Sequence, residues 1–273
     1  MLFYHFLTNL ESSGRFTFDQ TWGIISAYSL NCTLREFYLS PKGGYIMRKV
    51  YLAGPDVFFD NALEISQSQK SCCAQHNLIG LAPLDNEIPP CSSKYETAEI
   101  IVRSNIDMIN ACDFVIANLT NFRGTAEHPS CDSGTAWECG YAVALHKPVL
   151  AYTDKAISVP RDLRSSIDYC IIGSFADALR YSSAFKIISD KKSIQECSEL
   201  VSLDPADLSI HDADAYGAFR LGYVFAQGIN AAYHVSDARS LVEKYGSFDR
   251  NGVKFEDFDA PVNIMISVNH KLV

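Results

Sequence analysis

The feature that most constrains the fold is an alternation of short apolar runs with helical patterns between residues 48 and 153. The predicted elements are strands at 50–52, 113–119 and 148–153, helices at 60–76, 97–112 and 134–146, and an extended segment at 78–84. This alternation is typical of a parallel sheet that carries helices on both faces. Such sheets bind ligands at the carboxyl ends of their strands. We therefore look for a functional site in the loops at 53–58, 84–87 and 119–132.

The composition favours an ordinary soluble globular protein and argues against several partners. The chain has 273 residues, 48% of them hydrophobic and 20% charged, so it can bury a large core. Its net charge of −9 argues against a protein that binds the phosphates of a nucleic acid polymer. No apolar run approaches the roughly 18 residues of a membrane span. The first ten residues lack a basic region and a cleavage site, so we expect a cytoplasmic protein without a membrane partner.

Cysteine and histidine patterns predict neither a metal site nor a disulfide framework. The nine cysteines are an odd number, and no pair of CxxC motifs occurs. The seven histidines form no HExxH motif, and no GxGxxG or Walker sequence is present. We expect reduced thiols, no metal and no cofactor.

We expect four segments in the chain. Residues 1–46 have no clear period and are interpreted as an N-terminal extension. Residues 47–154 form the α/β core, 155–242 an insertion or degenerate partial repeat, and 243–273 a return to the core.

A similarity between two parts of the sequence underlies the expectation of a repeat. The run DADAYGAFRLGY ends at residue 223, and its last ten residues, 214–223, repeat the layout of 132–141 without a gap. Arg220 stands where the first window has Glu138, so a true copy would have lost any acid chemistry. The alternative is coincidence, because glycine and aromatic residues recur on many buried helices.

Glu138 is the strongest candidate for a catalytic group. Near the start of a helix, unpaired N–H groups and the helix dipole favour an ionised carboxylate by roughly 0.3 to 1 kcal/mol. Such a carboxylate can attack an anomeric carbon and form a glycosyl ester. The alternative is a capping box, Thr135-x-x-Glu138, in which the glutamate only bonds the first amide of the helix. Asp132, six residues earlier, is a candidate proton donor, an N-cap or a solvated loop acid.

Asp107 is a second candidate proton donor, with an equally simple structural alternative. The predicted apolar stripe of its helix consists of Val102, Ile106 and Ile109. Asp107 lies away from that stripe, on the face that carries Arg103, so an exposed i,i+4 ion pair is the alternative.

Two residues near the first strand, Tyr51 and Phe58, have two interpretations each. Tyr51 is either a core residue or a phenol that holds Glu138. Phe58 either stacks on a flat base or packs at the surface. Gly54 begins a tight turn that is too short to cradle a phosphate.

Six motifs in order resemble the nucleoside 2-deoxyribosyltransferases. They are YLAGP (51–55), PLDNE (83–87), NIDMI (105–109), DFVIANLT (113–120), FRG (122–124) and DSGTAWECGY (132–141). The resemblance covers about residues 48–154 and resumes from EKYG (243–246) to PVNIM (261–265). It implies a flavodoxin-like three-layer α/β sandwich with a parallel sheet of about five strands.

The resemblance implies a role for each candidate. Glu138 is the nucleophile that attacks C1′ of a 2′-deoxynucleoside, and Tyr51 orients it. Asp107 and Asp132 handle the proton of the leaving base and bind it.

The resemblance also implies residues that bind the substrate and an assembly. Asn263 and Met265 match an element that reaches the 5′-hydroxyl of the sugar from a neighbouring subunit, so a homo-oligomer is expected. The remaining substrate-binding candidates are Gly54, Phe58, Glu87 and Arg123.

The expected function is therefore transfer of a deoxyribosyl group between nucleobases, with nucleosides and nucleobases as the small-molecule partners. Because 155–242 is interposed before the Asn263 element, two alternatives stay open. The first is an N-glycosidase that hydrolyses deoxynucleosides or their 5′-monophosphates. The second is a non-catalytic nucleotide-binding protein.

Overall fold

The computed structural model describes residues 47–122, 130–155, 161–184, 209–210, 215–229, 231–233, 258, 260 and 263–272. All of them lie within one compact unit, Met47–Val273. The expected N-terminal extension, 1–46, lies outside the described residues. None of the helices described is long and apolar enough to cross a membrane.

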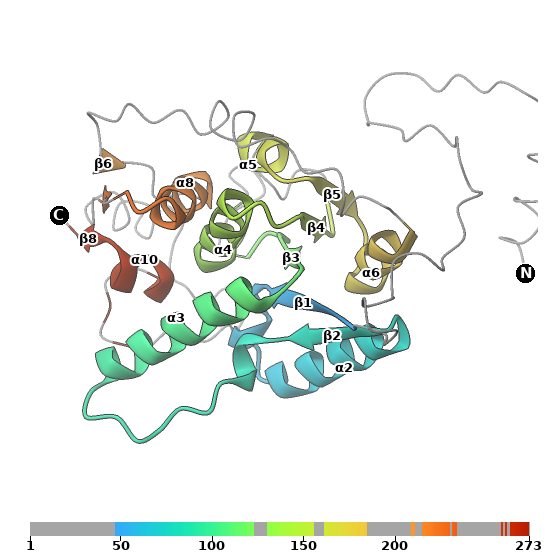
Figure 1. The fold of residues 1–273 in the computed structure, drawn as a ribbon, viewed down its shortest axis with the longest axis horizontal. Helices are drawn as coiled ribbons and strands as arrows, with labels where there is room; N and C mark the ends of the chain where they lie inside the picture. The colour runs from blue at the N-terminus through green and yellow to red at the C-terminus, as the bar shows by residue number, and fades with distance from the viewer. Residues whose placement is uncertain are drawn as a thin grey trace, which may run out of the picture. The chain divides into compact units, whose positions relative to one another are not determined.

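A five-stranded parallel sheet forms the centre of this unit (Figure 1). Its strands are β1 (Arg48–Ala53), β2 (Leu78–Leu81), β3 (Phe114–Asn118), β4 (Val149–Thr153) and β5 (Tyr169–Ile172). The strand order is β2-β1-β3-β4-β5, and every neighbouring pair is parallel. This is the order of flavodoxin-like folds, whose ligands bind where the order reverses, between β1 and β3. The predicted fold class is confirmed.

Helices follow the strands at the predicted places. The main helices are α2 (Ala62–Gln75), α3 (Lys94–Ala111), α4 (Ser133–Ala144), α5 (Arg161–Ser166), α6 (Phe175–Ala184), α8 (Ala215–Ala226) and α10 (Ile264–Asn269). Two 3-10 turns, η1 (Pro55–Phe58) and η2 (Pro83–Asp85), follow β1 and β2. Three short parallel strands form a second sheet in the order β6-β7-β8, with bounds Ser209–Ile210, Ala232–Tyr233 and Lys271–Leu272.

Alternating side chains of β1 face two separate hydrophobic cores. Val50 and Leu52 pack in a core with residues of α2 and α6, whereas Tyr51 and Ala53 pack in one with residues of α3, α4 and α8. Successive residues of a strand point to opposite faces of its sheet. The sheet is therefore the middle layer of a three-layer sandwich, and Tyr51 points toward α4.

The segment 155–242 takes part in the fold in two ways. Its strand β5 pairs with β4 and completes the central sheet, which therefore extends beyond residue 154. Its helix α8 packs along α4, and α10 packs against α3, α4 and α8 (Figure 1). The helix that carries Glu138 is thus covered by elements from the C-terminal part of the same chain.

A buried histidine joins the C-terminal element to α4. The indole Nε1 of Trp137 donates a hydrogen bond to Nε2 of His270 at 2.9 Å. Burial lowers the pKa of His270 to about 4, although a hydrogen bond to the Ala231 backbone opposes the shift. A proton on Nε2 would point an N–H at the Trp137 N–H, so the contact requires a neutral imidazole.

We expect the free energy of unfolding to fall as the pH is lowered from about 6.5 toward 4. The pKa of His270 is lower in the folded chain than its ordinary 6.5, so the unfolded chain binds more protons in this window. The neutral His270 contributes to the free energy of unfolding above pH 6.5. This contribution is lost as the pH falls toward 4, by up to about 3 kcal/mol. Urea unfolding at pH 7 and pH 4.5 measures it. The His270→Gln variant should show a smaller loss, and an equal loss in both proteins would contradict the assignment.

Candidate active site

The carboxylate of Glu138 is buried and held by two side chains from other elements. Glu138 is 4% exposed. Its Oε1 accepts a hydrogen bond from the Tyr51 hydroxyl at 2.6 Å and lies 3.4 Å from Nδ2 of Asn105. The capping-box alternative is wrong, because the N-cap of α4 is Asp132 and Glu138 lies six residues beyond it.

Tyr51 supplies the shorter of these hydrogen bonds. Its side chain is fully buried on β1. Burial and then the negative charge of Glu138 raise the pKa of Tyr51 well above its usual value. The phenol therefore keeps its proton and donates a hydrogen bond to the carboxylate. Tyr51 is both a core residue and the partner of Glu138, so its two interpretations hold together.

Asn105 is a site residue that the sequence analysis missed. It lies on α3, is 5% exposed, and its Oδ1 accepts a hydrogen bond from Nδ2 of Asn86 at 3.1 Å. That bond directs the NH₂ group of Asn105 toward Glu138. The signal was present in the sequence, since Asn105 is a polar residue on the stripe that α3 buries. The buried residues of α3 are Ala98, Val102, Asn105 and Ile109.

Asp107, in contrast, is exposed on α3. Two residues along a helix correspond to a rotation of about 200°, so Asp107 and Asn105 lie on different faces. The ion pair expected between Arg103 and Asp107 is replaced by a weak one between Arg103 and Glu99, with the charged atoms 3.9 Å apart. The structure thus brings Asn105, and not Asp107, to Glu138.

Asp132 caps the helix that carries Glu138. It is 5% exposed, and its Oδ2 accepts hydrogen bonds from the backbone N of Thr135 at 2.8 Å and from its hydroxyl at 2.9 Å. The N-cap interpretation is therefore confirmed. The capped turn places a second buried carboxyl group on the helix of Glu138.

The C-terminal element lies at α4 of the same chain. Asn263 is the N-cap of α10, and its Oδ1 accepts a hydrogen bond from the Met265 backbone at 3.0 Å. Its amide lies against the first turn of α4, since a Cβ at Gly134 would come within 2.7 Å of Nδ2. The sulfur of Met265 lies 4.0 Å from Nδ2 of Asn105. The family resemblance predicts this element from a neighbouring subunit, whereas here Asn263 and Met265 of the same chain lie at α4 and Asn105.

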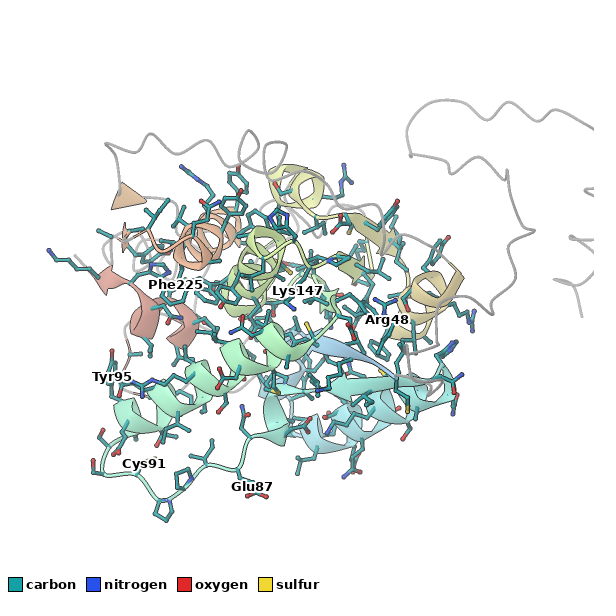
Figure 2. All side chains as sticks on the ribbon, viewed as in Figure 1. Arg48, Glu87, Cys91, Tyr95, Lys147 and Phe225 are labelled. Atoms are coloured by element: carbon teal, nitrogen blue, oxygen red, sulfur yellow. The ribbon has the colours of Figure 1, made fainter. Side chains whose placement is uncertain are left out.

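The other predicted binding residues are more scattered. Phe58 is half-buried in η1 and stacks on Phe122, with ring centroids 5.3 Å apart. Glu87 is exposed on the loop that leads to α3 (Figure 2). Arg123 lies outside the described residues. Gly54 follows β1 and lines a hollow on the opposite face of that strand from Tyr51.

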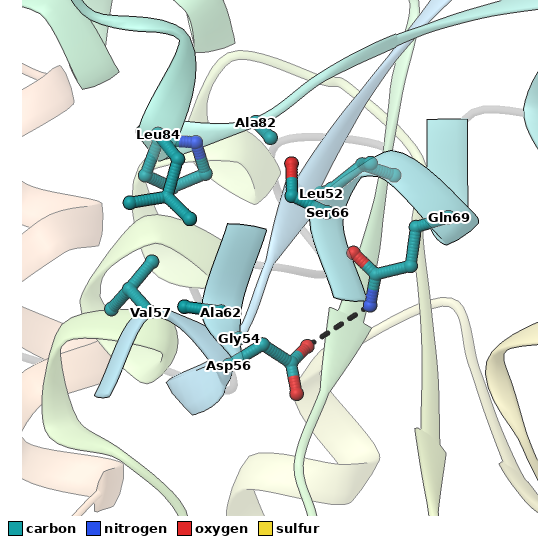
Figure 3. Close-up of a pocket in the computed structure, with 10 residues that line it drawn as sticks. Leu52, Gly54, Asp56, Val57, Ala62, Ser66, Gln69, Ala82 and Leu84 are labelled. Atoms are coloured by element: carbon teal, nitrogen blue, oxygen red, sulfur yellow. Dashed lines mark hydrogen bonds between the residues drawn. The ribbon is translucent and has the colours of Figure 1, made fainter. Parts of the chain in front are cut away.

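That hollow contains a carboxyl group that the sequence analysis did not select (Figure 3). Asp56 accepts hydrogen bonds from Nε2 of Gln69 at 3.0 Å and from Nδ2 of Asn118 at 3.3 Å. Burial raises the pKa of Asp56 above its ordinary value. The residues that line the hollow are Leu52, Gly54, Asp56, Val57, Ala62, Ser66, Gln69, Ala82, Pro83 and Leu84.

The described residues contain no group of three or more His, Cys, Asp or Glu side chains that could hold a metal ion. Burial raises the pKa of Cys139, beside Glu138, far above its ordinary value. A thiol in that state is a poor nucleophile.

Comparison with known proteins identifies relatives of this chain. An uncharacterized protein of Schizosaccharomyces pombe is 34% identical over 118 residues, which are 42% of this chain and 54% of that protein. The chain thus spans about half the length of this curated relative.

Two solved structures are similar to parts of the chain. A 2-deoxyribosyltransferase from Bacillus psychrosaccharolyticus is 20% identical, with a TM-score of 0.41 over 53% of this chain and 98% of that one. A 2-desoxiribosyltransferase from Leishmania mexicana is 27% identical, with a TM-score of 0.39 over 51% and 99%.

The family comparison covers the part of the chain that builds the site. Residues 50–175 match the model of the family described as nucleoside 2-deoxyribosyltransferase. That range contains Tyr51, Asn105, Asp132 and Glu138. The similarity of this chain to that family is therefore confined to residues 50–175.

Proposed function

We propose that the protein transfers a deoxyribosyl group from a 2′-deoxynucleoside to another nucleobase, with Glu138 as the nucleophile. The observation that carries this proposal is the 2.6 Å hydrogen bond from the Tyr51 hydroxyl to the buried carboxylate of Glu138. Hydrogen bonds to a carboxylate favour its charged form, which is the form that attacks carbon.

The reaction divides into two displacements. In the first, an oxygen of Glu138 bonds to C1′ while the N-glycosidic bond breaks, and its electron pair leaves with the base. In the second, a nitrogen of another base attacks C1′, and the ester breaks to restore the carboxylate. The transition states carry positive charge on the sugar, which a nearby carboxylate stabilises.

Proton transfer to the leaving base requires a separate acid. Of the two aspartates expected in this role, Asp132 is buried at the start of α4 and Asp107 is exposed. We assign the step to Asp132, which would protonate the departing base and accept the proton of the incoming one. A positioned acid of this kind contributes about 10²- to 10⁴-fold in rate.

Replacement of Glu138 by glutamine should abolish base exchange and leave the fold intact. Glutamine keeps the shape of the side chain and an oxygen that can accept the Tyr51 hydrogen bond, but it cannot form the ester. The measurement is chromatography of the products formed from deoxyinosine and free adenine. The matched control is Glu99→Gln, which removes a carboxylate from the exposed side of α3.

The same assay separates the proposed reaction from its rivals. Formation of deoxyadenosine by the wild-type chain, lost in Glu138→Gln, supports the proposal. Hypoxanthine with free sugar would show an N-glycosidase instead. No change in the deoxyinosine would leave only a binding function, and either of these results would overturn the transfer reaction.

Replacement of Tyr51 by phenylalanine should lower kcat about 10- to 100-fold with little change in KM. Hydrogen bonds to charged groups contribute about 1.5 to 3 kcal/mol, and each 1.4 kcal/mol is about a factor of ten. Steady-state kinetics and urea unfolding measure both effects. Tyr95→Phe is the control, because Tyr95 is 43% exposed on α3. Equal kinetics for the two variants would show that the Tyr51 bond does not position the nucleophile.

A further inference from the structure

The helices α4 and α8 correspond residue by residue. Both have 12 residues, and each position of α4 matches the position 82 residues later in α8. The match covers two of the large aromatic residues and the glycine between them. The matched pairs are Trp137 with Phe219, Gly140 with Gly222, and Tyr141 with Tyr223.

The contacts between the two helices are reciprocal. A Cβ at Gly140 would lie well under 3.0 Å from the carbonyl oxygen of Phe219, and a Cβ at Gly222 equally close to the carbonyl oxygen of Trp137. Trp137 and Phe219 are themselves a matched pair. The glycine of each helix therefore contacts the equivalent carbonyl group of the other helix. Reciprocity of this kind is the property of an interface with two-fold symmetry.

The ends of the two helices also match. His146 and Gly228, again 82 positions apart, both have left-handed backbones, with φ of 58° and 74°. The hydrogen bonds that close the two ends are Lys147 N to Ala142 O and Ile229 N to Val224 O, both at matched positions.

The flanking strands extend the correspondence. Parallel strands β3 and β4 flank α4, and parallel strands β6 and β7 flank α8. The connection before α8 is far shorter, since only 211–214 separate it from β6, whereas 119–132 separate α4 from β3. The second unit therefore lacks most of the loop that enters α4, and it has Arg220 in the position of Glu138.

The chain that follows this second unit completes the first. The α10 element, which comes after β7, places Asn263 against Gly134 and Met265 near Asn105. The helix that carries Glu138 thus packs against α8 of the second unit and against the α10 element that follows it.

We propose that residues 209–233, with strands β6 and β7 and helix α8, are a truncated second copy of the β3-α4-β4 unit, fused into the chain as a permanent partner. At α4 this copy takes the place that the same helix of a second molecule would occupy. The full chain therefore works as a monomer with one site, at Glu138, in contrast to the homo-oligomer expected from the sequence. The assignment of a site at Glu138 rests on the proposed function, whereas the reciprocal contacts of α4 and α8 are independent of any activity.

The first test is the mass of the full chain in solution. Light scattering after gel filtration, at about 1 and 100 µM, should give 30.3 kDa at both concentrations. The Tm should not change with concentration, because a partner within the chain needs no association. A mass of twice that value, or a Tm that rises with concentration, would overturn the proposal. Neither measurement needs a substrate, so failure of the transfer reaction would be a separate result.

The second test is the equivalence of the two glycines. Gly140→Ala and Gly222→Ala should lower the Tm by similar amounts, about 4 to 10 °C, with the mass unchanged. The double variant should lose less than the sum, because both substitutions act on one interface. Gly173→Ala is the control, since the three atoms nearest to a Cβ there belong to the side chain of Asp177 and not to the backbone of another helix.

The outcomes of the glycine test are distinct. A Gly222→Ala protein that melts like the control, or a mass change caused by Gly140→Ala alone, would overturn the proposal. If neither glycine variant is recovered in soluble form while the control is, the two positions are equivalent, as expected. Loss of one variant but not the other would contradict the equivalence.

Discussion

The site depends on a hydrogen bond between two residues far apart in the sequence, Tyr51 and Glu138. An ionised carboxylate that is removed from water costs several kcal/mol unless donors replace the lost hydration. Tyr51 and Asn105 supply those donors from β1 and α3. The contact forms only if α4 packs over the face of β1 to which Tyr51 points. The hydrogen bond on which the proposed catalysis depends therefore requires the packing of the core.

The helix that carries Glu138 is held on its other sides by the C-terminal part of the chain. α8 approaches α4 at backbone distance through Gly140 and Gly222, and α10 contacts both helices. Protein interiors are close-packed, so a helix enclosed in this way has little freedom to move. This enclosure fixes the position of Glu138 relative to Tyr51. Through α8, the interposed segment therefore contributes to the packing that holds α4.

Most of the fold was predictable, whereas the partners of Glu138 were predictable only in part. The strands and helices up to β4 followed from periodicity, and Tyr51 and Glu138 were paired by resemblance. Asp107 was selected from the sequence as a proton donor, whereas Asn105, two residues earlier, is the buried residue of α3 that reaches Glu138. An acid was preferred for its chemistry, but position on the buried stripe decided which side chain reaches the site. Asn105 turns inward because it lies on the face of α3 that buries Val102 and Ile109.

The sequence by itself determined the order of the elements, the parallel sheet and the place of the carboxylate on its helix, because these follow from local periodicity and motif spacing. It also contained the similarity between 132–141 and 214–223, but not the contacts that these two segments make. Tertiary structure alone decided that Asn263 lies at the α4 of its own chain and that Gly140 and Gly222 make reciprocal contacts. Such contacts join residues up to 160 positions apart, as between Asn105 and Met265. Only the packing of the whole core determines which distant segments meet.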